Sequence, residues 1–211
     1  MPVGILRRLA PVVPAIAVLA VGASAAATTT TLSVAVVKPA GVSLKYPSSW
    51  TTLARDPKAL AAQQRRLARR NPKIALNAQQ QAEFLQAAKF RAVDLAAATA
   101  GRFASNVTVQ VDEQGGFPGS LDEFTNDARA QYEQQGVTIV SLSSVRVGGT
   151  TGYRADTRAT VTKTDGTMLA ARVGQLFTPR NAGSVIITVA TADDVTGARL
   201  IDAILGSVRR V

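Results

Sequence analysis

Cysteine and histidine are both absent from the 211 residues of this chain. Without them the protein has no disulfide, no thiol nucleophile, no zinc site of the usual kind and no imidazole for a Ser-His-Asp triad. We therefore expect no catalytic residue, no bound metal and no cofactor. The chemistry that stays open is acid–base catalysis by carboxylates acting with a hard cation.

Aromatic residues are scarce, at 5%, and charged residues make up only 18% of the chain. Apolar residues nevertheless account for 46%, and the mean hydropathy is +0.12. This composition excludes wholesale disorder, and the lack of a second long apolar run argues against a protein with many membrane spans. The length fits one globular domain with a short appendage.

Residues 1–25 have the pattern of a secretory signal peptide. Arg7 and Arg8 supply positive charge, Leu9–Val21 is mostly apolar, and Ala23-Ser24-Ala25 provides the small residues that signal peptidase requires. We expect a secreted or extracytoplasmic envelope protein that begins near Ala26 and keeps no stable membrane anchor. An uncleaved anchor is the alternative. Because the chain has no cysteine, a lipid anchor is excluded.

The rest of the chain divides into a tail and one domain. Residues 26–38 open with a low-complexity threonine run and are expected to form a flexible mature N-terminus. Residues 39–211 are expected to form the domain. Its first strand covers about 41–46, and Asp56-Pro57 and Asn71-Pro72 each signal a helix start, which predicts a basic helical pair at about 56–88.

Alternating apolar residues predict strands through the second half of the chain. The clearest is at 107–111, and three more, at 137–147, 152–162 and 167–177, are separated by glycine-containing turns. Ser120 and Glu123 form a capping box for a helix that ends at Gly136. A continuous apolar run at 184–190 suits a central strand, and Thr191 with Asp194 is expected to cap a last helix. The class is α+β, an antiparallel sheet of about six or seven strands packed by helices.

Several segments, in order, resemble the PsbP-like α/β/α sandwich family, in particular its exported actinobacterial LpqN-type branch. The resemblance covers nearly the whole mature chain and is carried by Val42–Trp50, Phe90–Asp94, Ser105–Val111, Leu121–Phe124, Val147–Gly149 and Ile204–Arg209. Most members of this family are non-catalytic binding or assembly factors, including photosystem accessory subunits and a nuclear-transport factor. The resemblance therefore implies a non-catalytic binding or assembly role for this chain. LpqN-type members are usually lipoproteins, and the missing cysteine is a departure from that pattern.

Positive charge is concentrated in one stretch of the sequence. The formal charge is +10 overall, but residues 38–91 have a balance of +9 and residues 92–211 a balance of −1. The candidate surface for an anionic partner consists of Arg65, Arg66, Arg69, Arg70 and Lys73. Like charges four residues apart on a helix repel each other, although cations near a helix C-terminus are also favoured by its dipole. Nucleic acid is an unsuitable partner because the protein is exported and no aromatics lie among the arginines.

Two other groups of residues have both a functional and a structural interpretation. The acidic pairs Asp112-Glu113, Asp122-Glu123 and Asp193-Asp194 suit catalysis or a cation, but their positions at helix starts and a strand end favour capping. Tyr46 and Trp50 are candidate pocket aromatics, with core packing as the alternative.

The sequence thus favours a non-enzymatic exported binding or assembly factor of the bacterial cell envelope. Its expected partner is an envelope protein, a lipid headgroup or an anionic polymer. The alternative is an extracellular hydrolase that depends on carboxylates and a metal.

Overall fold

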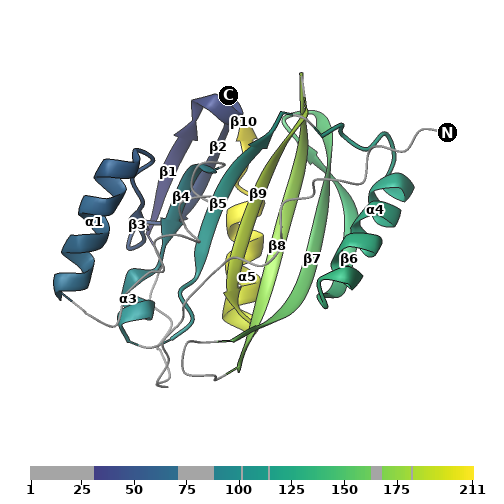
Figure 1. Cartoon of the computed structure of the whole chain (residues 1–211). Helices are drawn as coiled ribbons and strands as arrows, with labels where there is room; N and C mark the ends of the chain where they lie inside the picture. Colours follow the sequence, from purple (N-terminus) through teal and green to yellow (C-terminus); the bar gives the residue numbers. More distant parts are fainter. Residues whose placement is uncertain (1–30, 71–87, 101, 114, 163–167, 182) are drawn as a thin grey trace.

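The computed structural model describes residues 31–70, 88–100, 102–113, 115–162, 168–181 and 183–211. Ten strands form two antiparallel sheets (Figure 1). The larger sheet contains β3 (Thr51–Thr52), β4 (Ala88–Val93), β5 (Asn106–Asp112), β6 (Thr138–Val147), β7 (Thr150–Thr162), β8 (Met168–Arg180) and β9 (Gly183–Ala192). Its order is β3-β4-β5-β9-β8-β7-β6.

The smaller sheet is formed by segments from opposite ends of the chain. It contains β1 (Leu32–Val37), β2 (Val42–Pro47) and β10 (Arg209–Arg210), with β2 in the middle. The helices are α1 (Pro57–Arg70), α3 (Leu95–Thr99), α4 (Leu121–Gln134) and α5 (Val195–Leu205), and a single 3-10 turn, η1 (Lys38–Ala40), joins β1 to β2. The predicted α+β class with an antiparallel sheet is confirmed.

Glycine at two turns allows the consecutive hairpins of the large sheet. Gly148 and Gly149, between β6 and β7, have φ values of 55° and 82°, and Gly183, at the start of β9, has a φ of 102°. Positive φ is costly for residues with a Cβ, so these turns need glycine. The three strands predicted at 137–147, 152–162 and 167–177 correspond to β6, β7 and β8.

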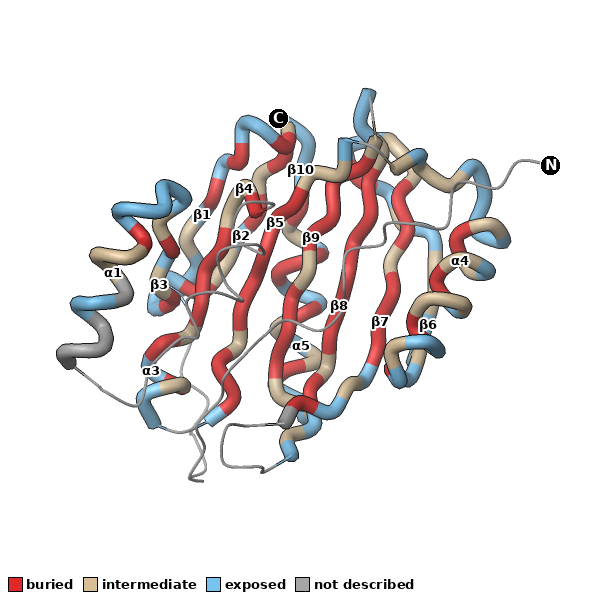
Figure 2. The backbone as a smooth tube through the Cα atoms, viewed as in Figure 1, coloured by how far each residue is buried: buried red, intermediate tan, exposed pale blue. Residues whose placement is uncertain are grey.

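The two faces of the large sheet are covered by different elements. Val185 and Ile187 of β9 pack in the same cluster as Ile201 and Ile204 of α5 and the inward residues of the small sheet. Ile186, between them, packs with α4 on the opposite face, because successive residues of a strand point to opposite faces. Burial is greatest along β5, β9 and β8, the middle of the sheet (Figure 2). The molecule therefore has helix, sheet and helix layers, with the small sheet beside α5.

In the N-terminal half, one expectation was wrong and another falls mostly outside the described residues. The tail expected to be flexible over 26–38 contains strand β1, whose Ala35 and Val37 are buried in the core. The first helix of the expected basic pair is α1. The second falls mostly on 71–87, outside the described residues, and Ala88 already belongs to β4.

The signal-peptide segment, 1–25, also lies outside the described residues. Among the helices that are described, none is long and apolar enough to cross a membrane.

Candidate functional site

Helix α1 presents the basic surface. Two of its residues, Leu60 and Gln63, hold it against the sheet and the chain before it. Asp56 Oδ1 accepts a hydrogen bond from the Ala59 amide at 2.7 Å, which caps the helix as the sequence predicted. Leu60 is buried in a cluster with Leu53 and Val93. Gln63 holds the same side of the helix against the chain before it: its Nε2 donates to the Thr52 carbonyl at 2.9 Å and its Oε1 accepts from the Ala54 amide at 3.0 Å. No pattern in the sequence marks Gln63 as the residue that makes these contacts.

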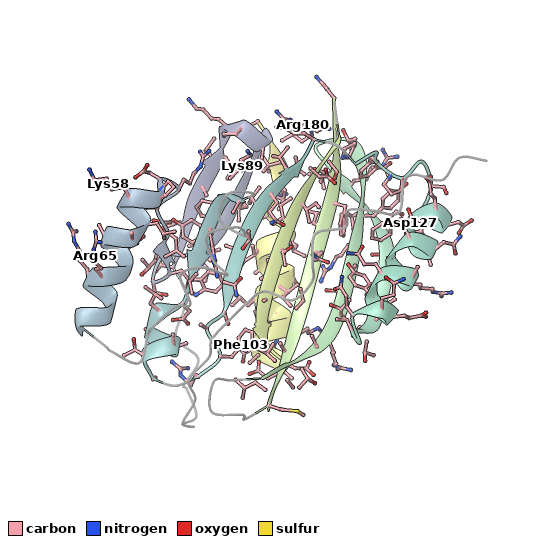
Figure 3. The ribbon with its side chains drawn as sticks, in the orientation of Figure 1. Lys58, Arg65, Lys89, Phe103, Asp127 and Arg180 are labelled. Carbon is pink, nitrogen blue, oxygen red and sulfur yellow. The ribbon has the colours of Figure 1, made fainter. Side chains whose placement is uncertain are left out.

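The cations of α1 therefore lie on the side away from the sheet. Lys58, Arg65 and Arg66 are exposed, and Figure 3 shows Lys58 and Arg65 extending outward from the helix. The ion pairs of the described residues include none of these three side chains. Arg69 and Arg70 belong to the last turn of α1, where the structure describes only the backbone, and Lys73 lies outside the described residues.

The two candidate pocket aromatics occupy packing positions. Trp50 is only 6% exposed and belongs to the main hydrophobic cluster. Tyr46 packs against that cluster and meets Phe90 edge-on, with ring centroids 5.4 Å apart. Neither residue lines the groove between α4 and β6 or the small cavity next to Val137 and Val161. These contacts fit the alternative of core packing.

The acidic pairs serve as caps and salt-bridge partners. Ser120 Oγ accepts from the Glu123 amide at 3.1 Å, and Glu123 Oε2 accepts from the Gly119 amide at 2.7 Å, a reciprocal arrangement at the start of α4. Asp194 Oδ1 accepts from the Gly197 amide at 2.6 Å and caps α5. The side-chain cap of α5 is therefore Asp194 alone, because the Thr191 hydroxyl donates to the Ala192 carbonyl instead.

Three of the four remaining acids of these pairs also have partners, and for Glu113 this is Arg180, 3.8 Å away. Asp112 Oδ1 accepts from the Gly115 amide, and Asp193 forms an ion pair with Arg158 at 2.9 Å. Within the described part of the chain, no three acidic side chains lie close enough together to hold a metal ion.

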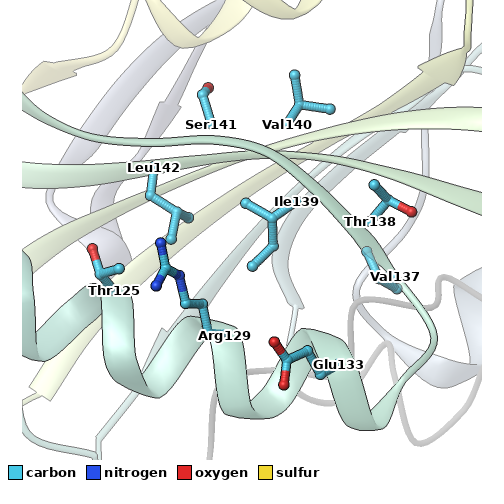
Figure 4. Close-up of a pocket in the computed structure, with 9 residues that line it drawn as sticks. All are labelled: Thr125, Arg129, Glu133, Val137, Thr138, Ile139, Val140, Ser141 and Leu142. Carbon is cyan, nitrogen blue, oxygen red and sulfur yellow. The ribbon is translucent and has the colours of Figure 1, made fainter.

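A groove that the sequence did not predict runs between α4 and β6, the edge strand of the large sheet. It has a volume of about 770 Å³ and is partly open to solvent. Figure 4 shows Arg129 and Glu133 of α4 facing Ile139 and Leu142 of β6 across it. The only sequence signal for it is the pair of charges four residues apart on α4, which is equally typical of a solvated helix face.

A chain of three polar side chains, two buried and one half-buried, lies under α4, on the face of the sheet opposite α5. Tyr132 Oη donates to Gln175 Oε1 at 2.6 Å, and Gln175 Nε2 donates to Thr188 Oγ1 at 3.0 Å. Burial raises the pKa of Tyr132 well above its ordinary value. Further along the same face, Arg91 of β4 is 6% exposed, and burial lowers its pKa to about 10.

On the other face, a salt-bridge network joins β7 to α5. Arg154 Nε lies 2.8 Å from Asp156 Oδ2, and Arg154 Nη2 lies 2.6 Å from Asp202 Oδ1. Partial burial acts to lower the pKa of Arg154, but its hydrogen bonds to the two carboxylates outweigh that effect and raise it. Arg154 and Asp156 both belong to β7, and Asp202 is the contact of this network with α5.

Comparison with protein-family models finds no match, and comparison with curated proteins finds none either. Solved structures do match. The cyanobacterial PsbP of Synechocystis sp. PCC 6803 aligns over 90% of this chain and 99% of its own, with 14% identity and a TM-score of 0.50. The Ran-binding protein Mog1p of Saccharomyces cerevisiae aligns over 87% and 97%, with 8% identity and a TM-score of 0.49.

LpqN of Mycobacterium tuberculosis, described as involved in cell envelope biogenesis, aligns over 86% of this chain and 85% of its own, with 9% identity and a TM-score of 0.42. A Pseudomonas aeruginosa protein of unknown function aligns over 43% of this chain and spans 60% of its own length, with 14% identity and a TM-score of 0.36. The likeness to PsbP confirms the PsbP-like fold that the sequence predicted. At this identity it shows the fold and not the function.

Proposed function

We propose that this protein is a non-enzymatic binding or assembly factor of the bacterial cell envelope, and that the exposed face of α1 contacts an anionic envelope component. The observation that carries the proposal is the row of exposed cations on α1, which has no acidic partner among the described residues. The signal-peptide pattern of residues 1–25 supports an envelope location.

The arrangement of α1 supports recognition of a charged surface over insertion into an apolar one. The contacts of Leu60 and Gln63 turn one side of the helix toward the sheet, and the opposite side has Lys58, Arg65 and Arg66. A single basic face raises the local concentration of an anionic partner and orients it. Such an attraction weakens as salt increases, because exposed charges are screened over about 8 Å at physiological ionic strength.

The test replaces Arg65, Arg66, Arg69 and Arg70 with glutamine in the exported protein, which removes four positive charges. The matched control removes the same charge from scattered exposed positions, namely Arg129, Arg146, Arg180 and Arg199. Binding is measured by sedimentation with wall and membrane fragments of the source bacterium at low and high salt. We expect the α1 variant to bind about tenfold more weakly at low salt and the control to bind like the wild type.

Circular dichroism and urea unfolding show whether both variants keep the wild-type fold. Exposed substitutions of this kind usually change stability by about 0.5 kcal/mol or less each. Equal binding by a folded α1 variant and the wild type at low salt contradicts the proposal. An equal loss in both variants shows that net charge, and not the α1 face, determines binding.

A further inference from the structure

The outer face of the small sheet has an exposed aliphatic stripe. Leu32, Val34 and Val36 of β1 are 41%, 61% and 57% exposed. The residues between them point the other way, and Ala35 and Val37 are buried in the core. A strand that is apolar on both faces is typical of a sheet covered on both sides, yet this one has solvent on its outer side. Contiguous exposed apolar residues commonly mark a contact surface.

Cations lie on the same face, and the register of the strands places them. Val34 pairs with Lys45 of β2, and Val36 pairs with Ser43, which in turn pairs with Arg209 of β10. Directly paired residues of an antiparallel sheet point to the same side. Lys45 and Arg209 are exposed, and so these two cations lie on the same face as the aliphatic stripe, on its β2 and β10 side.

No acidic residue is present in the elements that form this face. Strands β1, β2 and β10 and the turn η1 contain Lys38, Lys45, Arg209 and Arg210 and no aspartate or glutamate. Arg209 Nη1 donates to the carbonyls of Gly206 and Val208, which holds the guanidinium at the C-terminal end of α5. Arg210 points to the other side and donates to Thr150 Oγ1 and the Pro179 carbonyl.

A mixed aliphatic and cationic surface of this kind suits the interface of an anionic bilayer, where apolar side chains enter the headgroup boundary and cations contact phosphates. A second copy of the chain suits it poorly, because a two-fold contact through this face would bring cations of one copy close to cations of the other, and these elements contain no acidic residue to pair with them.

We infer that the outer face of the small sheet, formed by Leu32, Val34, Val36, Lys45 and Arg209, rests on an anionic lipid bilayer. This surface is separate from α1, which packs beside β3 through Gln63, so the inference does not depend on the proposed role of the α1 arginines.

The absence of cysteine makes a direct test practical. The exported protein with Val34→Cys, labelled with the fluorophore nitrobenzoxadiazole, is mixed with vesicles of phosphatidylglycerol and phosphatidylcholine, or of phosphatidylcholine alone. Val195→Cys is the matched control, because Val195 is 69% exposed but lies at the start of α5. We expect a blue shift, and quenching by nitroxide-labelled lipid, at position 34 with the anionic vesicles only, and no change at position 195.

Affinity is measured by co-sedimentation with the same anionic vesicles. The variant Val34→Thr/Val36→Thr/Lys45→Gln keeps residues that suit a strand and should bind at least about tenfold more weakly, of which about fivefold comes from the lost lysine. The α1 variant with four glutamines should keep its signal at position 34.

Three results would overturn the inference: no response at position 34 at low salt, unchanged vesicle affinity of the folded triple variant, or a stable dimer that buries position 34 without lipid. The first two leave the proposed role of α1 intact, because that role is tested with the α1 variant and whole envelope fragments.

Discussion

Tyr132 is fully buried, and its hydroxyl donates to Gln175 at 2.6 Å. Tyr132→Phe removes this bond and leaves Gln175 Oε1 without its donor, which should cost about 1–2 kcal/mol of unfolding free energy at neutral pH. Tyr153→Phe should cost less, because none of the hydrogen bonds described involves the Tyr153 hydroxyl and its ring instead stacks on Phe124. Urea unfolding of both variants at pH 7 measures the difference.

The same tyrosine should make stability depend on pH in the alkaline range. Its pKa is raised from 10.0 by burial, so above that pH the unfolded chain loses the proton while the folded protein keeps it. The contribution is therefore fully present below pH 10 and is lost as pH rises toward the folded pKa. At about pH 11 the penalty of Tyr132→Phe should be about 1 kcal/mol smaller than at pH 7. A penalty that stays constant or grows would contradict the assignment.

Arg154 neutralises a carboxylate that cannot easily reach water. The Asp156 side chain is 9% exposed, whereas that of Asp202, the second partner of Arg154, is 65% exposed. Arg154→Met leaves Asp156 with only the Ser141 hydroxyl at 3.2 Å among its described side-chain partners, and should cost about 2–3 kcal/mol. Asp202→Asn should cost less than about 1 kcal/mol, because exposed ion pairs contribute little. Similar losses in the two variants would show that the pair with Asp202 dominates.

At the scale of elements, α5 approaches the sheet closely over a glycine. A Cβ on Gly174 of β8 would overlap Ile201 Cγ2 and lie 3.1 Å from Leu205 Cδ1. Gly174→Ala should therefore displace α5 and cost about 1–3 kcal/mol. Gly116→Ala is the control, since a Cβ there would meet nothing within 4 Å. Thermal unfolding compares them, and an equal midpoint for Gly174→Ala and the wild type would contradict this packing.

Elements with local signals were predictable from the sequence. The Asp56-Pro57 start of α1 and the Ser120–Glu123 box of α4 hold in the structure because caps depend on residues that are adjacent in the chain. Strand β10 and helix α3 are too short to show a period. The attachment of β10 to the small sheet was missed because its partner β2 lies more than 160 residues away, and such pairing leaves no local pattern.

At the scale of the whole molecule, the sequence showed how charge is distributed along the chain. It did not show which sides of α1 and β1 face the solvent. The +9 balance of residues 38–91 predicted a basic surface, whereas the contacts of Gln63 and Leu60 determine which side of α1 reaches solvent. The stripe on β1 was hidden because Leu32–Val37 is apolar at nearly every position. Only the packing of Ala35 and Val37 identifies the inward set.

The boundary of the folded domain gives the last prediction. Strand β1 forms six paired positions with β2 and buries Ala35 and Val37, so it belongs to the domain and not to a flexible tail. A chain that begins at Lys38 should lose about 2–4 kcal/mol of unfolding free energy relative to one that begins at Ala26, because the core beneath β2 becomes exposed. Urea unfolding of the two forms measures this loss, with circular dichroism to confirm that the shorter form folds. Equal stability would mean that β1 adds no net stability to the domain, and would return residues 26–38 to the status of a tail.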